Sequence, residues 1–237
     1  PYGWDGFSPL EDFAIADYGD MALDYAHTAD IPDRITAHVA GILAAGAGCI
    51  ALGGDHSVTL PILRAHAAKH GPLALIQFDA HTDTWPDDDP LRIDHGTFCY
   101  KAVREGLIDV GASAHVGIRT VVGDNLGIAI HDARAVHQRG PEAVAADLRA
   151  RVGGRPVYLS FDIDALDPAF APGTGTPVWG GLSSAQAAQI LRGLAGINLV
   201  GGDVVEVSPP FDHAAITAVA AAHVAMELIC LWGWCRR

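Results

Sequence analysis

The feature that most constrains the fold of this 237-residue chain is a set of short apolar runs that end abruptly in polar clusters. One run covers residues 73–78 and leads into the Asp-Ala-His-Thr-Asp segment 79–83, and another covers residues 156–161 and leads into Asp-Ile-Asp at 162–164. Apolar runs of this length without alternation are typical of strands buried on both faces, as in parallel sheets. The chain therefore predicts a central sheet covered by helices on both sides.

Segments with helical spacing and helix-capping residues separate these runs. The expected strands cover residues 13–16, 49–52, 73–78, 115–118, 128–130, 157–161 and 198–207. The expected helices cover residues 31–45, 57–70 with Ser57 as its cap, 95–106, 141–152, 183–194 with Ser183 as its cap, and 214–234. This alternation predicts a three-layer α-β-α fold with a mainly parallel central sheet. Right-handed crossovers would then bring the carboxyl ends of all strands to one edge.

Potential metal ligands follow three of the expected strands. His56 follows strand 49–52 across a Gly-Gly turn. Asp79, His81 and Asp83 alternate after the next strand, so an extended backbone would point all three to one face. Asp162 and Asp164 repeat this spacing later in the chain. Each cluster taken alone is also explained by turn or capping chemistry.

The three clusters together indicate a metal site if they lie in one crevice. Four carboxylates and two imidazoles brought together would repel one another and be poorly solvated without cations. Two divalent ions would balance the charge of the four aspartates. The ligand set is rich in oxygen and contains no cysteine, which favours manganese over structural zinc. A two-metal centre that activates a water molecule is the expected outcome.

Charge and cysteine usage limit the partners and the compartment. The net charge is −13, from 15 Lys and Arg against 28 Asp and Glu, which argues against nucleic acid or an anionic membrane as a partner. An acidic surface suits a cationic small molecule, although solubility alone also explains it. The four cysteines lie far apart, and the chain begins without a signal-peptide pattern. The apolar run 214–234 contains His223 and Glu227 and indicates a buried core helix rather than a membrane span. We therefore expect a cytoplasmic protein.

Six motifs resemble those of the arginase/agmatinase ureohydrolases. They lie at residues 53–57, 79–83, 94–97, 160–168, 173–177 and 204–207, in the order found in that family. The resemblance implies an arginase-like fold, in which residues 1–237 form a single ureohydrolase catalytic domain that apparently lacks the family's N-terminal segment. It also implies a homo-oligomer, either a trimer or a hexamer.

The resemblance further implies a role for each ligand. His56 and Asp83 would hold one Mn²⁺, His81 and Asp164 would hold the other, and Asp79 and Asp162 would bridge the two ions. A hydroxide bridging the two Mn²⁺ would attack the guanidinium carbon of the substrate, and the tetrahedral intermediate would collapse to urea and an amine.

Three further residues match family positions at the substrate. His95 matches a histidine suggested to carry a proton to the leaving amine, and Glu206 matches a glutamate that pairs with the guanidinium. Thr176 matches a threonine near the same group. Considered without the resemblance, His95 could also mark a helix entry and Glu206 an ordinary ion pair at a strand end.

The loop at residues 84–93 bears on the choice of substrate. It lacks the Ser/Asn-rich pattern with which arginases recognise the amino and carboxylate groups of arginine, and the segments 94–98, 105–109 and 117–120 resemble agmatinases. The expected reaction is hydrolysis of agmatine to putrescine and urea. One alternative is a guanidinobutyrase or another guanidino-acid amidinohydrolase, in which Arg92 would meet a substrate carboxylate. A second alternative is a metal-binding member of the family without catalytic activity.

Overall fold

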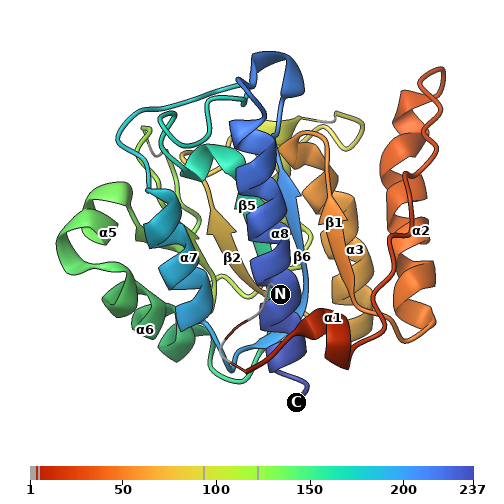
Figure 1. Ribbon diagram of the computed structural model, residues 1–237. Helices are drawn as coiled ribbons and strands as arrows, with labels where there is room; N and C mark the ends of the chain where they lie inside the picture. The colour runs from red at the N-terminus through yellow and green to blue at the C-terminus, as the bar shows by residue number, and fades with distance from the viewer. Residues whose placement is uncertain (1–3, 5, 93, 122) are drawn as a thin grey trace.

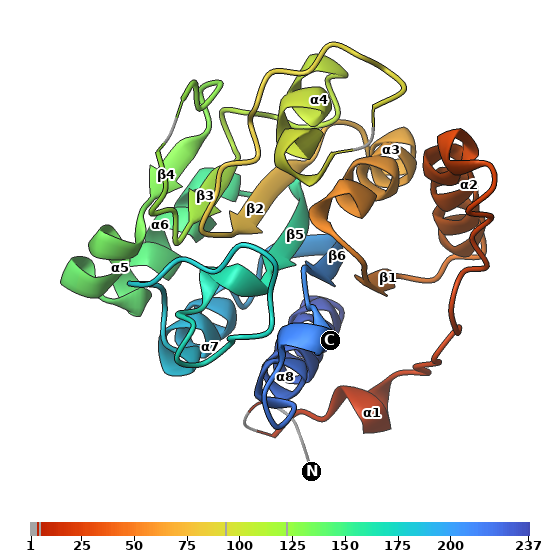
Figure 2. The same cartoon turned by 90° about the horizontal axis from the view of Figure 1, so that it is seen from above.

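A six-stranded parallel sheet forms the centre of the computed structural model, which describes residues 4, 6–92, 94–121 and 123–237. The strands are β1 (Cys49–Leu52), β2 (Ala74–Phe78), β3 (Ala114–Val116), β4 (Ala129–His131), β5 (Pro156–Asp162) and β6 (Asn198–Val205). Their order is β1-β6-β5-β2-β3-β4, and all five neighbouring pairs are parallel. Their carboxyl ends therefore share one edge, which Figure 2 shows from above.

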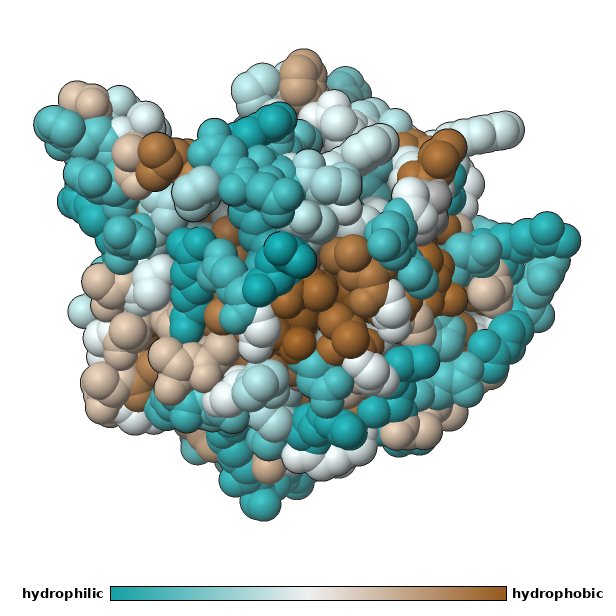
Figure 3. Space-filling model, turned by 180° about the vertical axis from the view of Figure 1, so that it is seen from behind, coloured by the Kyte–Doolittle hydropathy of each residue, from teal (hydrophilic) through white to brown (hydrophobic). Residues whose placement is uncertain are grey.

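Helices cover both faces of the sheet, which confirms the three-layer prediction. The helices are α1 (Pro9–Asp12), α2 (Ile31–Ala44), α3 (Thr59–His70), α4 (Phe98–Arg104), α5 (Ala133–Arg139), α6 (Pro141–Val152), α7 (Ser184–Gly193) and α8 (Ile216–Trp234). In Figure 1, α7 and α8 lie in front of the sheet, and Figure 2 shows α3 and α4 on the opposite face. Figure 3 shows this opposite face of the molecule, where apolar side chains gather near the centre and hydrophilic ones surround them.

Successive side chains of β2 belong to two different cores, as expected for a strand buried on both faces. Ala74, Ile76 and Phe78 pack in the core formed with α6, α7 and α8. Leu75 packs in a second core with side chains of α2, α3 and α4. By alternation Gln77 points to this second face, where no water can solvate its amide because the side chain is fully buried. A polar side chain at this position needs partners, and the site described below contains an acceptor for its Nε2.

Several elements differ from the predictions. The predicted strand 13–16 is wrong: the fully described segment 14–24 contains neither helix nor strand. Phe13 ends α1 and packs its ring edge-on against Trp232, 5.7 Å between centroids, so its apolar surface is buried by α8 rather than by a sheet. The helices α1 and α5, of which α5 starts at the cap Asp132, were not predicted.

Two predicted helices begin differently from the prediction. Asp55, not Ser57, is the first cap: its carboxylate accepts the backbone N–H of Ser57, and the 3₁₀ turn His56–Val58 precedes α3. Likewise the turn His95–Thr97, capped by Asp94, precedes α4. The predicted cap Ser183 is confirmed, because it forms a reciprocal capping box with Gln186.

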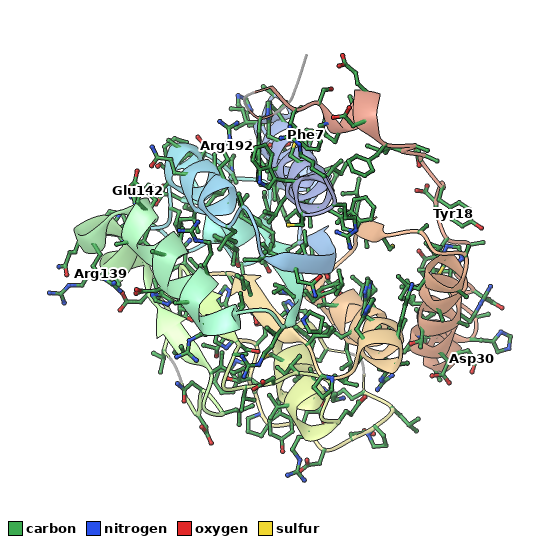
Figure 4. The ribbon with its side chains drawn as sticks, turned by 90° about the horizontal axis from the view of Figure 1, so that it is seen from below. Phe7, Tyr18, Asp30, Arg139, Glu142 and Arg192 are labelled. Atoms are coloured by element: carbon green, nitrogen blue, oxygen red, sulfur yellow. The ribbon has the colours of Figure 1, made fainter. Side chains whose placement is uncertain are left out.

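The helix α8 is, among the described residues, the one helix long and apolar enough to cross a membrane by length and composition. In the structure it lies along β6 and α7 and buries one side against them, as predicted for a core helix. Its Glu227 accepts hydrogen bonds from the indole of Trp4 and from the guanidinium of Arg192. Figure 4 labels Arg192, which lies on α7 beside α8. The core of the protein therefore accounts for the apolar character of this helix.

Candidate metal centre

The structure brings all six predicted ligands together at the carboxyl edge of the sheet. Asp79 directly follows β2, Asp162 is the last residue of β5, and His56 begins the turn after β1. Asp83 and Asp164 come from the segments that follow β2 and β5. All of these side chains are buried, and His81 alone of the six is partly exposed. The parallel topology therefore brings the segments that carry the six ligands to one edge of the sheet.

The ring nitrogen Nδ1 of His56 lies at the centre of one half of this cluster. It is 3.1 Å from Oδ2 of Asp79, 3.0 Å from Oδ2 of Asp83 and 3.2 Å from Oδ2 of Asp162. None of the three oxygens is aligned for an ordinary hydrogen bond, so this buried nitrogen has no hydrogen-bond partner in the described structure. One imidazole nitrogen surrounded by three carboxylate oxygens fits the ligand sphere of a cation better than a hydrogen-bonded network.

The second half of the cluster is built around His81. Its Nδ1 lies 3.0 Å from Oδ2 of Asp164 and 3.4 Å from Oδ1 of Asp79. The ligand atoms of His56, Asp79 and Asp83 form one group within 4.8 Å, and those of Asp79, His81 and Asp164 form another. Asp79 belongs to both groups, as a bridging carboxylate would. The residues thus fit a pair of divalent cations.

The backbone of residues 79–83 does not remain extended, contrary to the prediction. The strand ends at Phe78, and the carboxylate of Asp79 accepts the backbone N–H of His81 at 2.6 Å, which closes a turn. Asp83 has φ of 50°, in the left-handed region that a residue with a Cβ enters at a cost of about 1–2 kcal/mol. Its carbonyl accepts the backbone N–H groups of Cys99 and Tyr100 at the start of α4. A turn held by α4, rather than strand alternation, therefore directs Asp83 into the site.

The electrostatics of the cluster reflect four carboxylates placed in a buried site. Burial and the charge of Asp79 raise the pKa of Asp83 to about 7. Burial and the charge of Asp164 raise the pKa of Asp162 well above its usual value. Burial disfavours protonation of His81, but the adjacent carboxylates of Asp164 and Asp79 prevail and raise its pKa to about 10. The site thus attracts positive charge, which protons or metal ions can supply.

The three predicted substrate-side residues also lie at this cluster. Nδ1 of His95 is 3.1 Å from Oε1 of Glu206, and the same oxygen accepts the backbone N–H of His56 at 2.8 Å. The hydroxyl of Thr176 donates a long hydrogen bond of 3.4 Å to Oδ2 of Asp164. Glu206 has φ of 63°, so its backbone is in the left-handed region as well. Strain of this kind at two site residues is typical of functional sites.

Buried residues that were not predicted from the sequence support the ligands. Gln77 donates from Nε2 to Oδ2 of Asp79 at 2.8 Å, and Ser160 lies 2.8 Å from Nε2 of His56. Each is a polar residue inside an otherwise apolar run, two positions before a ligand, which is the signal that could have identified it.

Arg119 is a second kind of support that was not predicted from the sequence. Its guanidinium donates to the main-chain carbonyls of Asp164 at 2.6 Å and Ala165 at 3.3 Å, and to that of Val178. It therefore ties the ligand-bearing segment after β5 to the loop that carries Thr176.

A parallel three-layer fold with a buried cluster of four aspartates and two histidines at its carboxyl edge is suited to metal-dependent chemistry on a small molecule. The family model described as the arginase family matches residues 2–230. The chain belongs to the arginase family, and it is a hydrolase acting on linear amidines.

Individual relatives agree with this assignment. The chain is 53% identical to an agmatinase from Chromobacterium violaceum over 98% of its own length and 72% of the relative. A crystal structure described as a hypothetical agmatinase from Burkholderia thailandensis is 58% identical, with a TM-score of 0.95 over 98% of this chain and 74% of the other. An arginase from Bacillus subtilis is 26% identical, with a TM-score of 0.82 over 93% and 86% of the two chains.

Proposed function

We propose that this enzyme hydrolyses agmatine to putrescine and urea and that it holds two Mn²⁺ per chain. The observation that carries the proposal is the placement of Glu206 and His95 in contact with each other beside the two ligand groups. Agmatinase relatives at 47–53% identity support the choice of substrate.

The metal roles follow the two halves of the cluster. His56 and Asp83 would hold one ion, His81 and Asp164 the other, and Asp79 and Asp162 would bridge them. When bound, the two ions supply four positive charges and lower the pKa of a coordinated water, which makes it nucleophilic near neutral pH. The oxygen-rich donor set without thiolates suits Mn²⁺.

Glu206 is suited to position the guanidinium. Its side chain is only 11% exposed, so a charged pair formed there is weakly screened by solvent. Oε1 of Glu206 already accepts the backbone N–H of His56. Oε2 faces Gly175, and a Cβ atom placed on that glycine would be 3.9 Å from Oε2. A planar guanidinium can donate to a carboxylate in this position through parallel N–H groups. This interaction would hold the substrate carbon over the ligand cluster.

His95 is suited to deliver the proton that the leaving amine requires. Its side chain is 49% exposed, so it can exchange protons with solvent, while Glu206 orients its Nδ1. The products then balance: the C–N bond to the amine breaks, water supplies the oxygen of urea, and the amine leaves protonated.

The surroundings of Arg92 favour a substrate with a cationic tail over one with a carboxylate. Its guanidinium donates to Oδ2 of Asp94 at 2.7 Å and lies 3.9 Å from Oδ2 of Asp87. Lys101 also pairs with Asp87 at 3.0 Å. The positive charges of this loop are thus matched by aspartates, so Arg92 is not left to meet a substrate carboxylate. Of the expected loop, Ile93 lies outside the described residues.

The substrate is tested by assaying agmatine, arginine and 4-guanidinobutyrate side by side with Mn²⁺ present. We expect a clear preference for agmatine. The variant Arg92→Gln serves as a matched test of the guanidinobutyrase alternative, because it should leave agmatine turnover nearly unchanged but would impair a carboxylated substrate held by Arg92. A preference for a carboxylated substrate would refute the agmatine proposal, and its loss in Arg92→Gln would identify Arg92 as the residue that meets the carboxylate. A cytoplasmic location and a trimeric or hexameric assembly remain predictions.

A further inference from the structure

A row of four buried polar side chains crosses the sheet beneath the ligand cluster. Strand register pairs Gln77 of β2 with His115 of β3 on one side and with Ser160 of β5 on the other, and it pairs Ser160 with Asp203 of β6. All four residues are fully buried. Polar groups in a sheet interior are costly unless they have partners. Ser160 bonds to Asp203 and Gln77 donates to Asp79, whereas both ring nitrogens of His115 lack a partner among the described residues.

Asp203 makes the most connections in this row. Its Oδ1 accepts the hydroxyl of Ser160 at 2.6 Å, and its Oδ2 accepts the hydroxyls of Tyr158 at 2.7 Å and Thr59 at 2.8 Å. Three hydroxyl donors on one buried carboxyl replace the water it has lost. An apolar side chain in place of Asp203 would leave these three buried hydroxyls without their acceptor.

The direction of these hydrogen bonds determines the tautomer of His56. The hydroxyl of Ser160 has a single proton, which it donates to Asp203. Its oxygen lies 2.8 Å from Nε2 of His56 and can then only accept, so the proton of a neutral imidazole must sit on Nε2. This leaves the lone pair on Nδ1, the atom that faces Asp79, Asp83 and Asp162. A metal ligand requires a lone pair at that atom.

We propose that Asp203 is a positioning residue that acts through Ser160 to hold His56 in the tautomer that can bind a metal ion. The inference rests on the proposed metal site and adds a carboxylate–hydroxyl–imidazole chain to it. Asp203 does not touch the ligand cluster itself. In its absence Ser160 can turn its proton toward Nε2 of His56, which places the imidazole proton on Nδ1 and blocks coordination.

The test is calorimetric titration of Mn²⁺ into metal-free protein, with the substitutions Asp203→Asn and Ser160→Ala made singly and together. The asparagine amide can donate to Ser160 and reverse the chain. We expect Asp203→Asn to weaken Mn²⁺ binding about 10–100-fold, the range seen when outer partners of metal ligands are lost. In the Ser160→Ala background, Asp203→Asn should change Mn²⁺ affinity little further, because the hydroxyl that links Asp203 to His56 is already absent.

Thr59→Val provides the matched control, because it removes a hydroxyl from Asp203 without interrupting the chain to His56. It should leave Mn²⁺ affinity close to that of the original protein. The proposal is overturned if Asp203→Asn binds Mn²⁺ normally, if it weakens binding equally in the Ser160→Ala background, or if Thr59→Val weakens binding as much. Should Asp203→Asn not fold, normal Mn²⁺ affinity of Ser160→Ala would overturn it. Failure of the unsubstituted protein to bind Mn²⁺ would instead contradict the proposed metal site.

Discussion

Replacing Glu206 with glutamine tests the proposed substrate contact while leaving the shape of the site intact. Glutamine keeps an oxygen that can accept the backbone N–H of His56, so the fold and the ligand cluster should persist. It removes the negative charge and one of two acceptor oxygens. A hydrogen bond to a charged group contributes about 1.5–3 kcal/mol, and the side chain is only 11% exposed, so little of this is lost to solvent. We therefore expect a loss of about 1.5–3 kcal/mol in transition-state stabilisation, or roughly 10–10²-fold in kcat/KM.

The assay is urea release from agmatine at saturating Mn²⁺, combined with metal analysis of the purified variant. Glu105→Gln is a suitable control, because it makes the same chemical change on a surface glutamate that pairs with Arg64. The control should retain full activity. A loss of less than tenfold in Glu206→Gln, or a loss of bound metal along with activity, would refute the role assigned to Glu206.

Three further predictions concern the metals, the loops and acid stability. Thorough chelation should abolish activity and added Mn²⁺ should restore it; activity that survives chelation contradicts the metal mechanism. Arg119→Lys should lower the melting temperature and Mn²⁺ affinity together, because a single ammonium cannot reproduce the guanidinium bonds to the carbonyls of Asp164 and Val178. Burial lowers the pKa of His66 to about 4, so the folded protein binds fewer protons than the unfolded chain. Stability is therefore full above pH 6.5 and falls as pH drops toward 4, by about 2 kcal/mol between pH 7.5 and 5. Denaturant unfolding of His66→Leu should lack this component, and an unchanged pH dependence would contradict it.

The layered fold could be predicted from the sequence because its evidence is local. The unbroken apolar run before Asp79 indicates a strand buried on both faces, and the helices between such runs require parallel neighbours. Parallel order alone then places His56, Asp79 and Asp162 at one edge. The prediction of a strand at residues 13–16 was wrong because a run of four apolar residues does not specify which element it packs against. Here Phe13 packs against Trp232 of α8 rather than in the sheet.

The supporting residues could not be predicted in this way. Asp203 reaches His56 only through the register between β5 and β6, and no sequence pattern specifies which residues of two strands lie side by side. The left-handed backbone of Asp83 depends on two amide donors from α4, some sixteen residues farther along the chain. Both features arise from tertiary contacts. The ligands could therefore be predicted from the sequence, but the residues that orient them could not.

The single oxygen Oε1 of Glu206 accepts from the main chain of His56 and meets the ring of His95, so the groups assigned to metal, proton and substrate form one connected unit. Binding at one of these groups can then change the binding free energy at the others. Reciprocity requires that whatever factor the metal contributes to the affinity for a guanidinium, the guanidinium returns to the affinity for the metal. An occupied substrate site would consequently strengthen the equilibrium binding of metal, so the affinity for metal should be higher with substrate present than without it.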